Sequence, residues 1–131
     1  LGQDARRRRP HGRIGGVLGS DGGALLAALG NRLGPGSALL RAEDLAGPRL
    51  VADWDACTLD GRPLVDLAAW RAAVDGDRLA EVQGAFCLAW LDSQGALCLA
   101  RDAIGHRSLF YAPVAGGLVF ASTIHAVLAA L

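Results

Sequence analysis

Three cysteines and three histidines are the side chains of this sequence that are best suited to nucleophilic catalysis. A thiol becomes a strong nucleophile when a neighbouring base removes its proton. Cys57, which ends an apolar run, is the candidate nucleophile, and its candidate bases are His11, His106 and His125. A lone cysteine after such a run is more typical of a core position. We therefore expect Cys57 to be buried and unreactive.

The other two cysteines lie in a predicted β-hairpin. If residues 93–95 form a three-residue loop, Trp90 lies opposite Cys98, and strand alternation places Cys87 on the other face of the sheet. The cysteine count is odd and no C-x-x-C spacing is present. We therefore expect neither a disulfide nor a cysteine-bound metal.

Three aspartates close together, Asp53, Asp55 and Asp60, are the candidate ligands for a hard cation. Their spacing matches no Ca²⁺-binding loop, and alternating carboxylates beside a turn are typical of a solvated face. The glycine pairs lack the Gly-Lys-Ser/Thr ending of a phosphate-binding loop. We expect no metal site and no ATP site in these residues.

Composition favours one soluble globular domain. The chain has 131 residues, of which 52% are hydrophobic, and its formal net charge is zero. Such a length allows one core to be buried. No apolar run reaches the ~20 residues of a membrane span, and no signal peptide is recognisable. These features predict a cytoplasmic protein without a membrane partner.

Residues 1–12 are predicted to be a disordered basic leader. Arg6 to Arg9 form a basic run before Pro10, but no aromatic residue accompanies them to stack on a base, so we expect no nucleic-acid partner. The chain contains no methionine. This composition leads us to expect a piece of a longer protein or a processed product.

Hydrophobic periodicity predicts helices and strands along the whole chain. We expect strands at residues 14–18, 38–41 and 49–58, and helices at residues 23–33 and 64–74. A shorter helix, capped by Asp77, is expected to run to residue 83. Further strands begin at Phe86. The last helix is expected to be capped by Ser122 and to bury the stripe Ile124, Val127, Leu128 and Leu131.

The strand beginning at Phe86 is apolar on both faces. Phe86, Leu88 and Trp90 point to one side, and the residues between them point to the other. A sheet of such strands must be covered on both sides, because a solvated face would show polar alternation. We therefore predict an α+β fold, a four-layer αββα sandwich of two antiparallel sheets between helices.

The last third of the chain, residues 84–131, carries a series of short motifs in a characteristic order. The motifs are Gly84-Ala85-Phe86, Trp90-Leu91-Asp92, Ala100-Arg101-Asp102 followed by Gly105, Leu109-Phe110-Tyr111, and Phe120-Ala121-Ser122. The series resembles the class II, Ntn-hydrolase-type glutamine amidotransferase domain of the asparagine synthetase family, which includes β-lactam synthetases and lasso-peptide cyclases. The resemblance implies that residues 13–131 form such a domain and that Arg101, Asp102 and Gly105 form a tight structural turn.

The resemblance also implies a catalytic apparatus that this sequence lacks. Members of the family use an N-terminal cysteine whose α-amino group acts as the base. The corresponding position here is His11 or Gly12, ahead of Ile14. An Asn-Gly pair forms the family's oxyanion hole, and Asp53 and Trp54 stand at those positions. The downstream Gly-Ser-Asp stretch, which holds the substrate's amino-acid end, has no counterpart. We expect no catalytic residue in this domain.

These observations lead to one functional hypothesis and two alternatives. The hypothesis is a degenerate, glutaminase-inactive domain of an ATP-dependent amide-forming enzyme, with lasso-peptide macrocyclisation as the favoured variant. It implies no cofactor in this domain, ATP and magnesium in a following synthetase domain only, a peptide or amino-acid substrate, and a possible homodimer. One alternative is a free-standing binding module that partners a separately encoded synthetase or a peptide. The other is an active glutaminase that supplies ammonia for asparagine synthesis.

Overall fold

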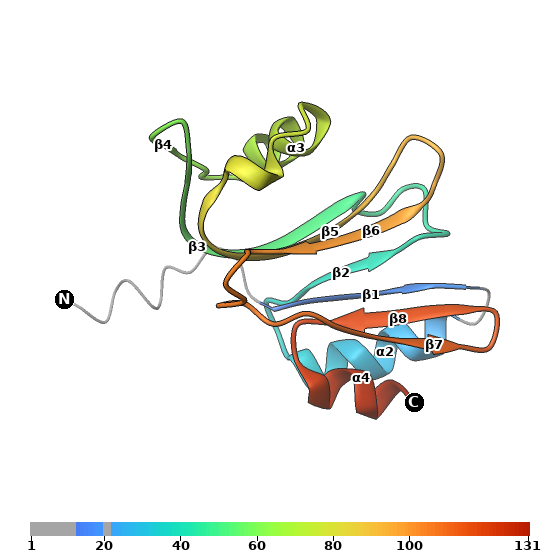
Figure 1. Ribbon diagram of the computed structural model, residues 1–131. Coiled ribbons are helices and arrows are strands. Elements are labelled where there is room, and N and C mark those ends of the chain that lie inside the picture. The colour runs from blue at the N-terminus through green and yellow to red at the C-terminus, as the bar shows by residue number, and fades with distance from the viewer. Residues whose placement is uncertain (1–12, 20–21) are drawn as a thin grey trace.

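A computed structural model describes residues 13–19 and 22–131, so the predicted basic leader lies outside the described residues (Figure 1). The strands form two four-stranded sheets. In sheet order, the strands of the first sheet are β2 (Ala38–Arg41), β1 (Ile14–Leu18), β8 (Gly117–Ala121) and β7 (Phe110–Val114). Those of the second sheet are β4 (Arg62–Pro63), β3 (Leu50–Leu59), β5 (Gln83–Leu91) and β6 (Leu97–Arg101).

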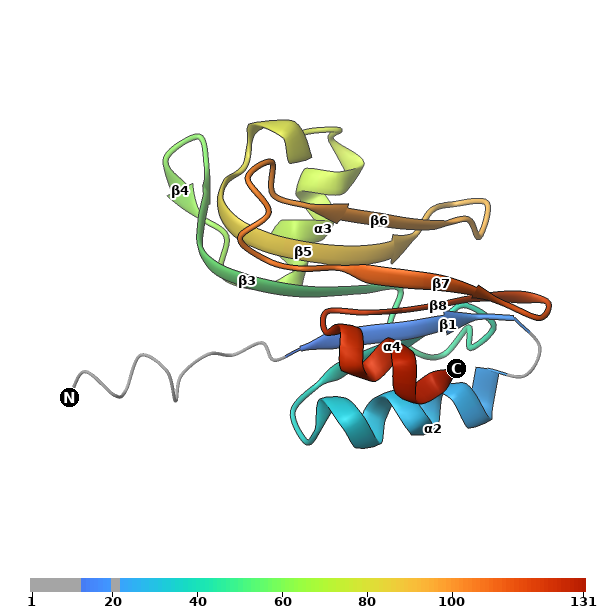
Figure 2. The same ribbon diagram turned by 60° about the horizontal axis from the view of Figure 1, so that its bottom comes forward.

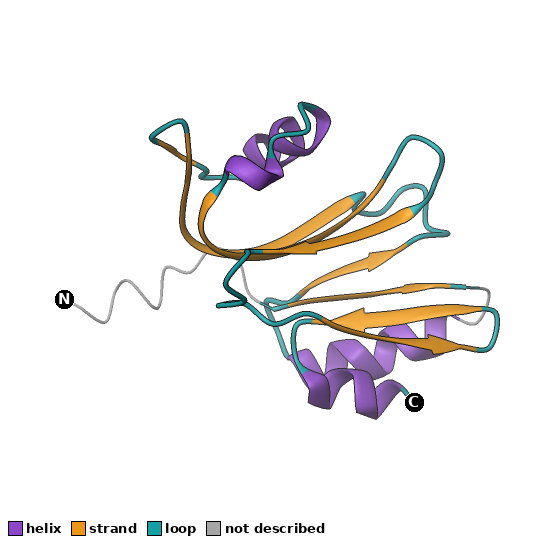
Figure 3. Cartoon of the chain, in the orientation of Figure 1, coloured by secondary structure: helices purple, strands orange, loops and turns teal. Residues whose placement is uncertain are grey.

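The two sheets stack face to face between helices. The helices are α2 (Gly22–Leu33), α3 (Leu67–Asp75), the short 3₁₀ helix η1 (Leu79–Glu81) and α4 (Ile124–Ala130). Helices α2 and α4 cover the outer face of the first sheet, and α3 covers the second (Figures 1 and 3). The predicted α+β sandwich is confirmed. One detail of the prediction is wrong, because β1 pairs with β2 in parallel while the other strand pairs are antiparallel.

The two faces of β5 belong to two different cores, as the alternation predicted. Phe86 and Leu88 pack in the cluster beneath α3. Cys87 and Ala89 pack between the two sheets, in a cluster that also contains Ile14 of β1. The β5–β6 hairpin has the predicted register, with Trp90 opposite Cys98. All three cysteines are free.

The helix ends differ from the predictions in their capping residues. Asp66 caps α3 by accepting a hydrogen bond from the N–H of Ala69 at 2.9 Å, so this helix starts later than predicted. Thr123 caps α4. The hydroxyl of Ser122, the predicted cap, instead accepts the N–H of Ile14 at 3.0 Å and ties the start of β1 to the end of β8. Asp77 does not cap η1, whose N-cap has no side-chain hydrogen bond.

The buried face of α4 also differs from the predicted stripe. Ala126, Val127 and Ala130 are buried against the first sheet and α2, because their small side chains allow the helix to approach closely. Ile124, Leu128 and Leu131 are instead 47%, 58% and 67% exposed. In the part of the chain that the structure describes, every helix is too short or too polar to cross a membrane.

Close packing between the sheets requires a glycine at position 16. A Cβ atom there would lie 2.4 Å from the carbonyl oxygen of Leu40 and 2.4 Å from the ring of Phe120. Gly16→Ala is therefore expected to lower the free energy of unfolding by about 1–3 kcal/mol, measured by urea denaturation. Gly23→Ala is the control, because its Cβ would meet nothing closer than 3.8 Å and alanine favours a helix. Equal losses in both variants would contradict the packing argument.

Candidate functional site

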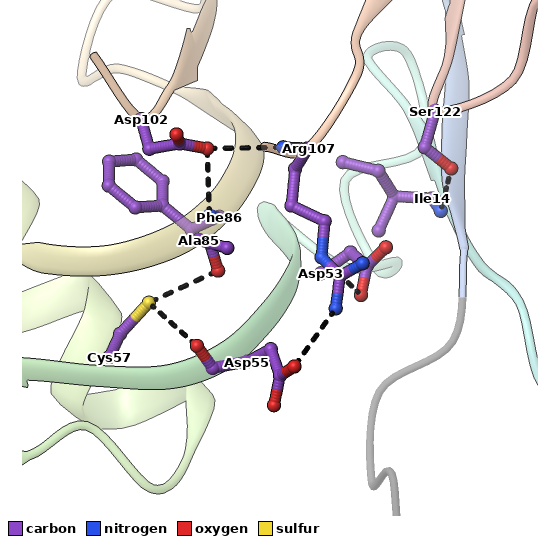
Figure 4. A network of polar contacts seen from close by, with 9 residues as sticks. All are labelled: Ile14, Asp53, Asp55, Cys57, Ala85, Phe86, Asp102, Arg107 and Ser122. Atoms are coloured by element: carbon purple, nitrogen blue, oxygen red, sulfur yellow. Dashed lines mark hydrogen bonds and ion pairs between the residues drawn. The ribbon is translucent and has the colours of Figure 1, made fainter. Parts of the chain in front are cut away.

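A tight turn after β6 is held by the carboxylate of Asp102, which is only 6% exposed (Figure 4). One carboxylate oxygen accepts the backbone N–H groups of Phe86 at 3.1 Å and Arg107 at 3.2 Å, and the other accepts that of His106 at 2.9 Å. The backbone N–H of Asp102 donates to Phe86, and Gly105, with φ +79°, donates to the carbonyl of Asp102. The turn therefore fastens to β5 the segment that leads from β6 of the second sheet to β7 of the first.

The hydrogen bonds keep Asp102 ionised. Burial alone would raise the pKa of this carboxyl, but the backbone N–H groups of His106, Phe86, Arg107 and Gly105 outweigh burial and lower the pKa to about 2. Such a carboxylate is an anchor for the turn and is not a proton donor at neutral pH. Arg101 is exposed and its guanidinium lies beside Gly105, so it flanks the turn without pairing with Asp102.

The predicted oxyanion-hole positions lie on opposite faces of β3. Trp54 is 7% exposed and packs beneath α3, with its ring centroid 5.8 Å from that of Trp70. Asp53 is 5% exposed and opposes Cys87 on the face toward the other sheet. The indole of Trp54 is therefore a core side chain, and of these two residues Asp53 is the one that presents a functional group on the inner face of the strand.

Arg107, which no local sequence pattern marks as a site residue, reaches this aspartate. Arg107 Nε lies 3.9 Å from Asp53 Oδ1, and Arg107 Nη2 lies 3.8 Å from Asp55 Oδ2 (Figure 4). Within the described residues, the buried Nε atom has no hydrogen-bond partner. The turn at Asp102 positions this arginine through its backbone N–H. Nothing local in the sequence pairs Arg107 with β3, because the two segments meet only through the fold.

Cys57 is buried and held as a neutral thiol. A bulge at Ala56, with φ +53°, turns its side chain into the cluster beneath α3. The thiol donates to the carbonyl oxygen of Ala85 at 3.2 Å. A Cβ at Gly84 would lie 2.8 Å from this sulfur, so the residue must be glycine. Burial raises the pKa of Cys57 to about 11, which disfavours the thiolate.

The candidate bases do not approach Cys57 in the described part of the structure. The His106 ring is exposed, with its Nδ1 3.4 Å from Asp102 Oδ2. His125 is exposed on α4, which covers the other sheet. His11 lies outside the described residues. The carbonyl groups that accept the Cys57 thiol cannot act as bases, so no described residue activates it.

The three clustered aspartates are separated in space. Asp60 forms a bidentate ion pair with Arg78, at 2.8 and 2.9 Å, away from the Asp53 and Asp55 side chains that Arg107 approaches. Over residues 13–19 and 22–131, no group of three or more His, Cys, Asp or Glu side chains is arranged to hold a metal ion.

An open pocket of about 650 Å³ lies beside the turn and the end of β3. Its wall includes Asp55, Gly84, Asp102, Ile104 and Arg107. This volume is within the range of small-molecule sites. The pocket thus combines the Arg107 cation, the exposed carboxylate of Asp55 and the ring of His106, but none of its lining residues is a cysteine.

Comparison with known proteins gives a family for the chain. A family model described as a glutamine amidotransferase domain matches residues 58–129, which is more than half of the chain. The matched segment contains the turn at Asp102 and Gly105, whereas Asp53 and Trp54 lie before it. No curated protein and no solved structure matches the chain. From the match and the two-sheet fold, we conclude that the chain belongs to the glutamine amidotransferase domain family.

Proposed function

We propose that this amidotransferase domain does not hydrolyse glutamine and serves as a structural domain of an ATP-dependent amide-forming enzyme of the asparagine synthetase type. In this proposal, ATP and magnesium bind a synthetase domain, in the same chain or in a separate one, and the substrate is a peptide or an amino acid. A lasso-peptide cyclase is the favoured variant, because cyclisation uses an amine of the substrate and needs no ammonia.

The observation that carries the proposal is the buried carboxylate of Asp53, at the position that the resemblance assigns to an oxyanion donor. A carboxylate only accepts hydrogen bonds when ionised, and its charge opposes the negative charge of a tetrahedral intermediate. Losing one donor at such a position costs about 3–4 kcal/mol of transition-state stabilisation. Arg107 is a nearby cation, but two carboxylates, those of Asp53 and Asp55, lie within 4 Å of it and offset its charge.

The positions of the three cysteines support the same proposal. The sequence contains three cysteines, and none of them precedes β1, where the family nucleophile would stand. Cys87 is buried between the sheets, and burial raises its pKa to about 12. Cys98 lies on β6, outside the pocket beside Arg107. Without a thiolate in that pocket, no covalent intermediate with glutamine can form there.

The direct test is glutamate release from glutamine by the purified protein. We expect no release above the buffer background, with or without ATP and an acceptor, and no mass increase after treatment with an alkylating glutamine analogue. An active class II amidotransferase, assayed in parallel, verifies both measurements. Cys57→Ala is the matched variant and should behave as the unmodified chain does.

Two outcomes would overturn the proposal. Glutamate release that Cys57→Ala abolishes would identify a working nucleophile that the buried geometry argues against. Stoichiometric labelling of Cys57 by the analogue, blocked by excess glutamine, would do the same. ATP-dependent ligation is tested separately, by following the release of pyrophosphate from ATP when the native full-length protein is incubated with ATP, magnesium and candidate peptides.

A further inference from the structure

We propose that the free edge of β6 binds an extended peptide segment that adds to the second sheet as a further strand and carries an acidic residue toward Arg101. The inference is independent of the glutaminase question, because it concerns the backbone of β6, which does not line the pocket beside Arg107. It rests on three observations within the described residues: the outward backbone groups of β6 have no partner there, two small pockets flank this edge, and Arg101 forms no ion pair there.

The backbone of β6 has hydrogen-bonding groups that point away from the sheet. The N–H of Leu91 on β5 donates toward β3, so the alternate positions of β5 face β6 and bond to Cys98 and Ala100. The backbone groups of Leu97, Leu99 and Arg101 therefore point outward. The strand ends its sheet (Figure 2), and no backbone partner for these groups occurs among the described residues.

The edge of β6 lacks the usual protection against strand pairing. Edge strands are normally shielded by proline, by charges within the strand, or by bulges. Two of the other edge strands contain a proline, Pro63 in β4 and Pro113 in β7. The β6 sequence has four uncharged residues before its terminal Arg101 and contains no proline. This edge is therefore open to an additional strand.

Two small pockets flank this edge, one on each face of the sheet. A pocket of about 170 Å³ lies on the inner face, where its wall includes Leu99, Leu109 and Tyr111. A pocket of about 250 Å³ lies on the α3 face, where its wall includes Phe86 and Ala100. Both are below the ~300 Å³ of small-molecule sites. Consecutive side chains of an added strand point to opposite faces, so two neighbouring apolar residues would fill both pockets.

Arg101 defines the charge of the expected partner. It lines both pockets and is exposed, and it forms no ion pair in the described part of the chain. The nearest acidic side chain along the sequence, Asp102, is fully engaged by backbone N–H groups. An acidic residue next to the apolar pair of the incoming strand would complement this charge.

The test is selection of peptides of about eight residues from a random displayed library on the immobilised protein. We expect enrichment of sequences with two adjacent apolar residues near an acidic one. Binding of a selected synthetic peptide should slow amide exchange at Leu97, Leu99 and Arg101 by about tenfold or more. Arg101→Glu should lower the affinity for that peptide about three- to tenfold, and reselection on this variant should enrich peptides with basic residues instead.

Matched controls separate strand addition from other binding. Arg32→Glu makes the same charge change at an exposed position of α2 and should leave the affinity unchanged. N-methylation of the peptide amides that face β6 should weaken binding by about 30-fold or more, because the hydrogen bonds and the close approach are both lost. N-methylation of the alternate amides, which face solvent, should have little effect.

Three outcomes would overturn the inference. The first is no enrichment above protein-free resin. The second is a peptide affinity that changes neither with Arg101→Glu nor with the position of N-methylation. The third is a dimer whose amides at Leu97, Leu99 and Arg101 are already protected without peptide, since a second copy would then occupy the edge.

Discussion

Replacing Trp70 by alanine is expected to lower the free energy of unfolding by about 3–5 kcal/mol. Trp70 is fully buried and is the main anchor of α3 on the second sheet. Its ring centroid lies 5.8 Å from that of Trp54 and 5.1 Å from that of Phe86. Removing the indole leaves a cavity at the centre of this cluster, which the neighbouring rings fill only partly. Denaturation in urea, followed by far-ultraviolet circular dichroism, measures the loss.

Trp70→Phe is the control for this prediction. The indole Nε1 of Trp70 is buried and has no hydrogen-bond partner within the described residues. Phenylalanine removes this unsatisfied donor and keeps an aromatic ring against Trp54 and Phe86, so we expect a loss below about 1.5 kcal/mol. If Trp70→Phe destabilised the protein as much as Trp70→Ala, the indole N–H would have a partner that the packing argument omits.

Replacing Asp102 by alanine is expected to cost about 3 kcal/mol or more, because three backbone N–H groups lose their acceptor at once. The turn that positions Arg107 should loosen with it. Asp102→Asn should cost less, since one oxygen remains as an acceptor, but its NH₂ group would face the N–H of His106. Urea denaturation of both variants checks this order.

Asp92→Ala provides a matched control for the Asp102 series. Asp92 also accepts two backbone N–H groups, those of Gln94 at 2.8 Å and Ala96 at 2.9 Å, but in an exposed hairpin loop where water can replace it. We expect a loss of about 1 kcal/mol or less. A loss as large as that of Asp102→Ala would show that burial is not what makes the Asp102 turn important.

The pH dependence of the same variants follows from the direction of the pKa shift. The pKa of Asp102 is lowered from 3.8 to about 2 in the folded protein, so folding favours the ionised form. The stabilisation that the ionised Asp102 carboxylate gives to folding is fully present above its pKa in the unfolded chain. It is lost as the pH falls through its pKa in the folded protein. The stability difference between wild type and Asp102→Asn should be constant above about pH 5 and shrink between about pH 4 and 2. A difference independent of pH would contradict the assignment.

Elements governed by local pattern were predictable from the sequence. The two-faced apolar alternation of β5 correctly indicated a sheet covered on both sides, because the side-chain period of a strand is fixed by its backbone. The short loop at residues 93–95 fixed the register that places Trp90 opposite Cys98. The burial of Cys57 followed from its apolar context.

The buried face and the N-cap of α4 were not predictable, because the sequence offers more than one suitable residue for each. The last helix has apolar side chains on more than one face, so its sequence allowed two buried stripes, and close packing against α2 favoured the one with alanines. Likewise, Ser122 and Thr123 are both suitable helix caps. Thr123 caps α4 because Ser122 is already bound to the N–H of Ile14, on a strand that is distant in the sequence.

In the candidate site, too, some features follow from the sequence and others from the tertiary structure alone. The sequence by itself determined that residues 1–13, which lead into the first strand, contain no cysteine, and that an aspartate, Asp53, follows the apolar start of β3. Strand alternation requires Asp53 and Trp54 to point to opposite faces, but alternation cannot tell which face is the outer one. Only the tertiary structure decided that Trp54 packs beneath α3 and that Arg107 reaches Asp53, because the loop after β6 brings that arginine across the sheets.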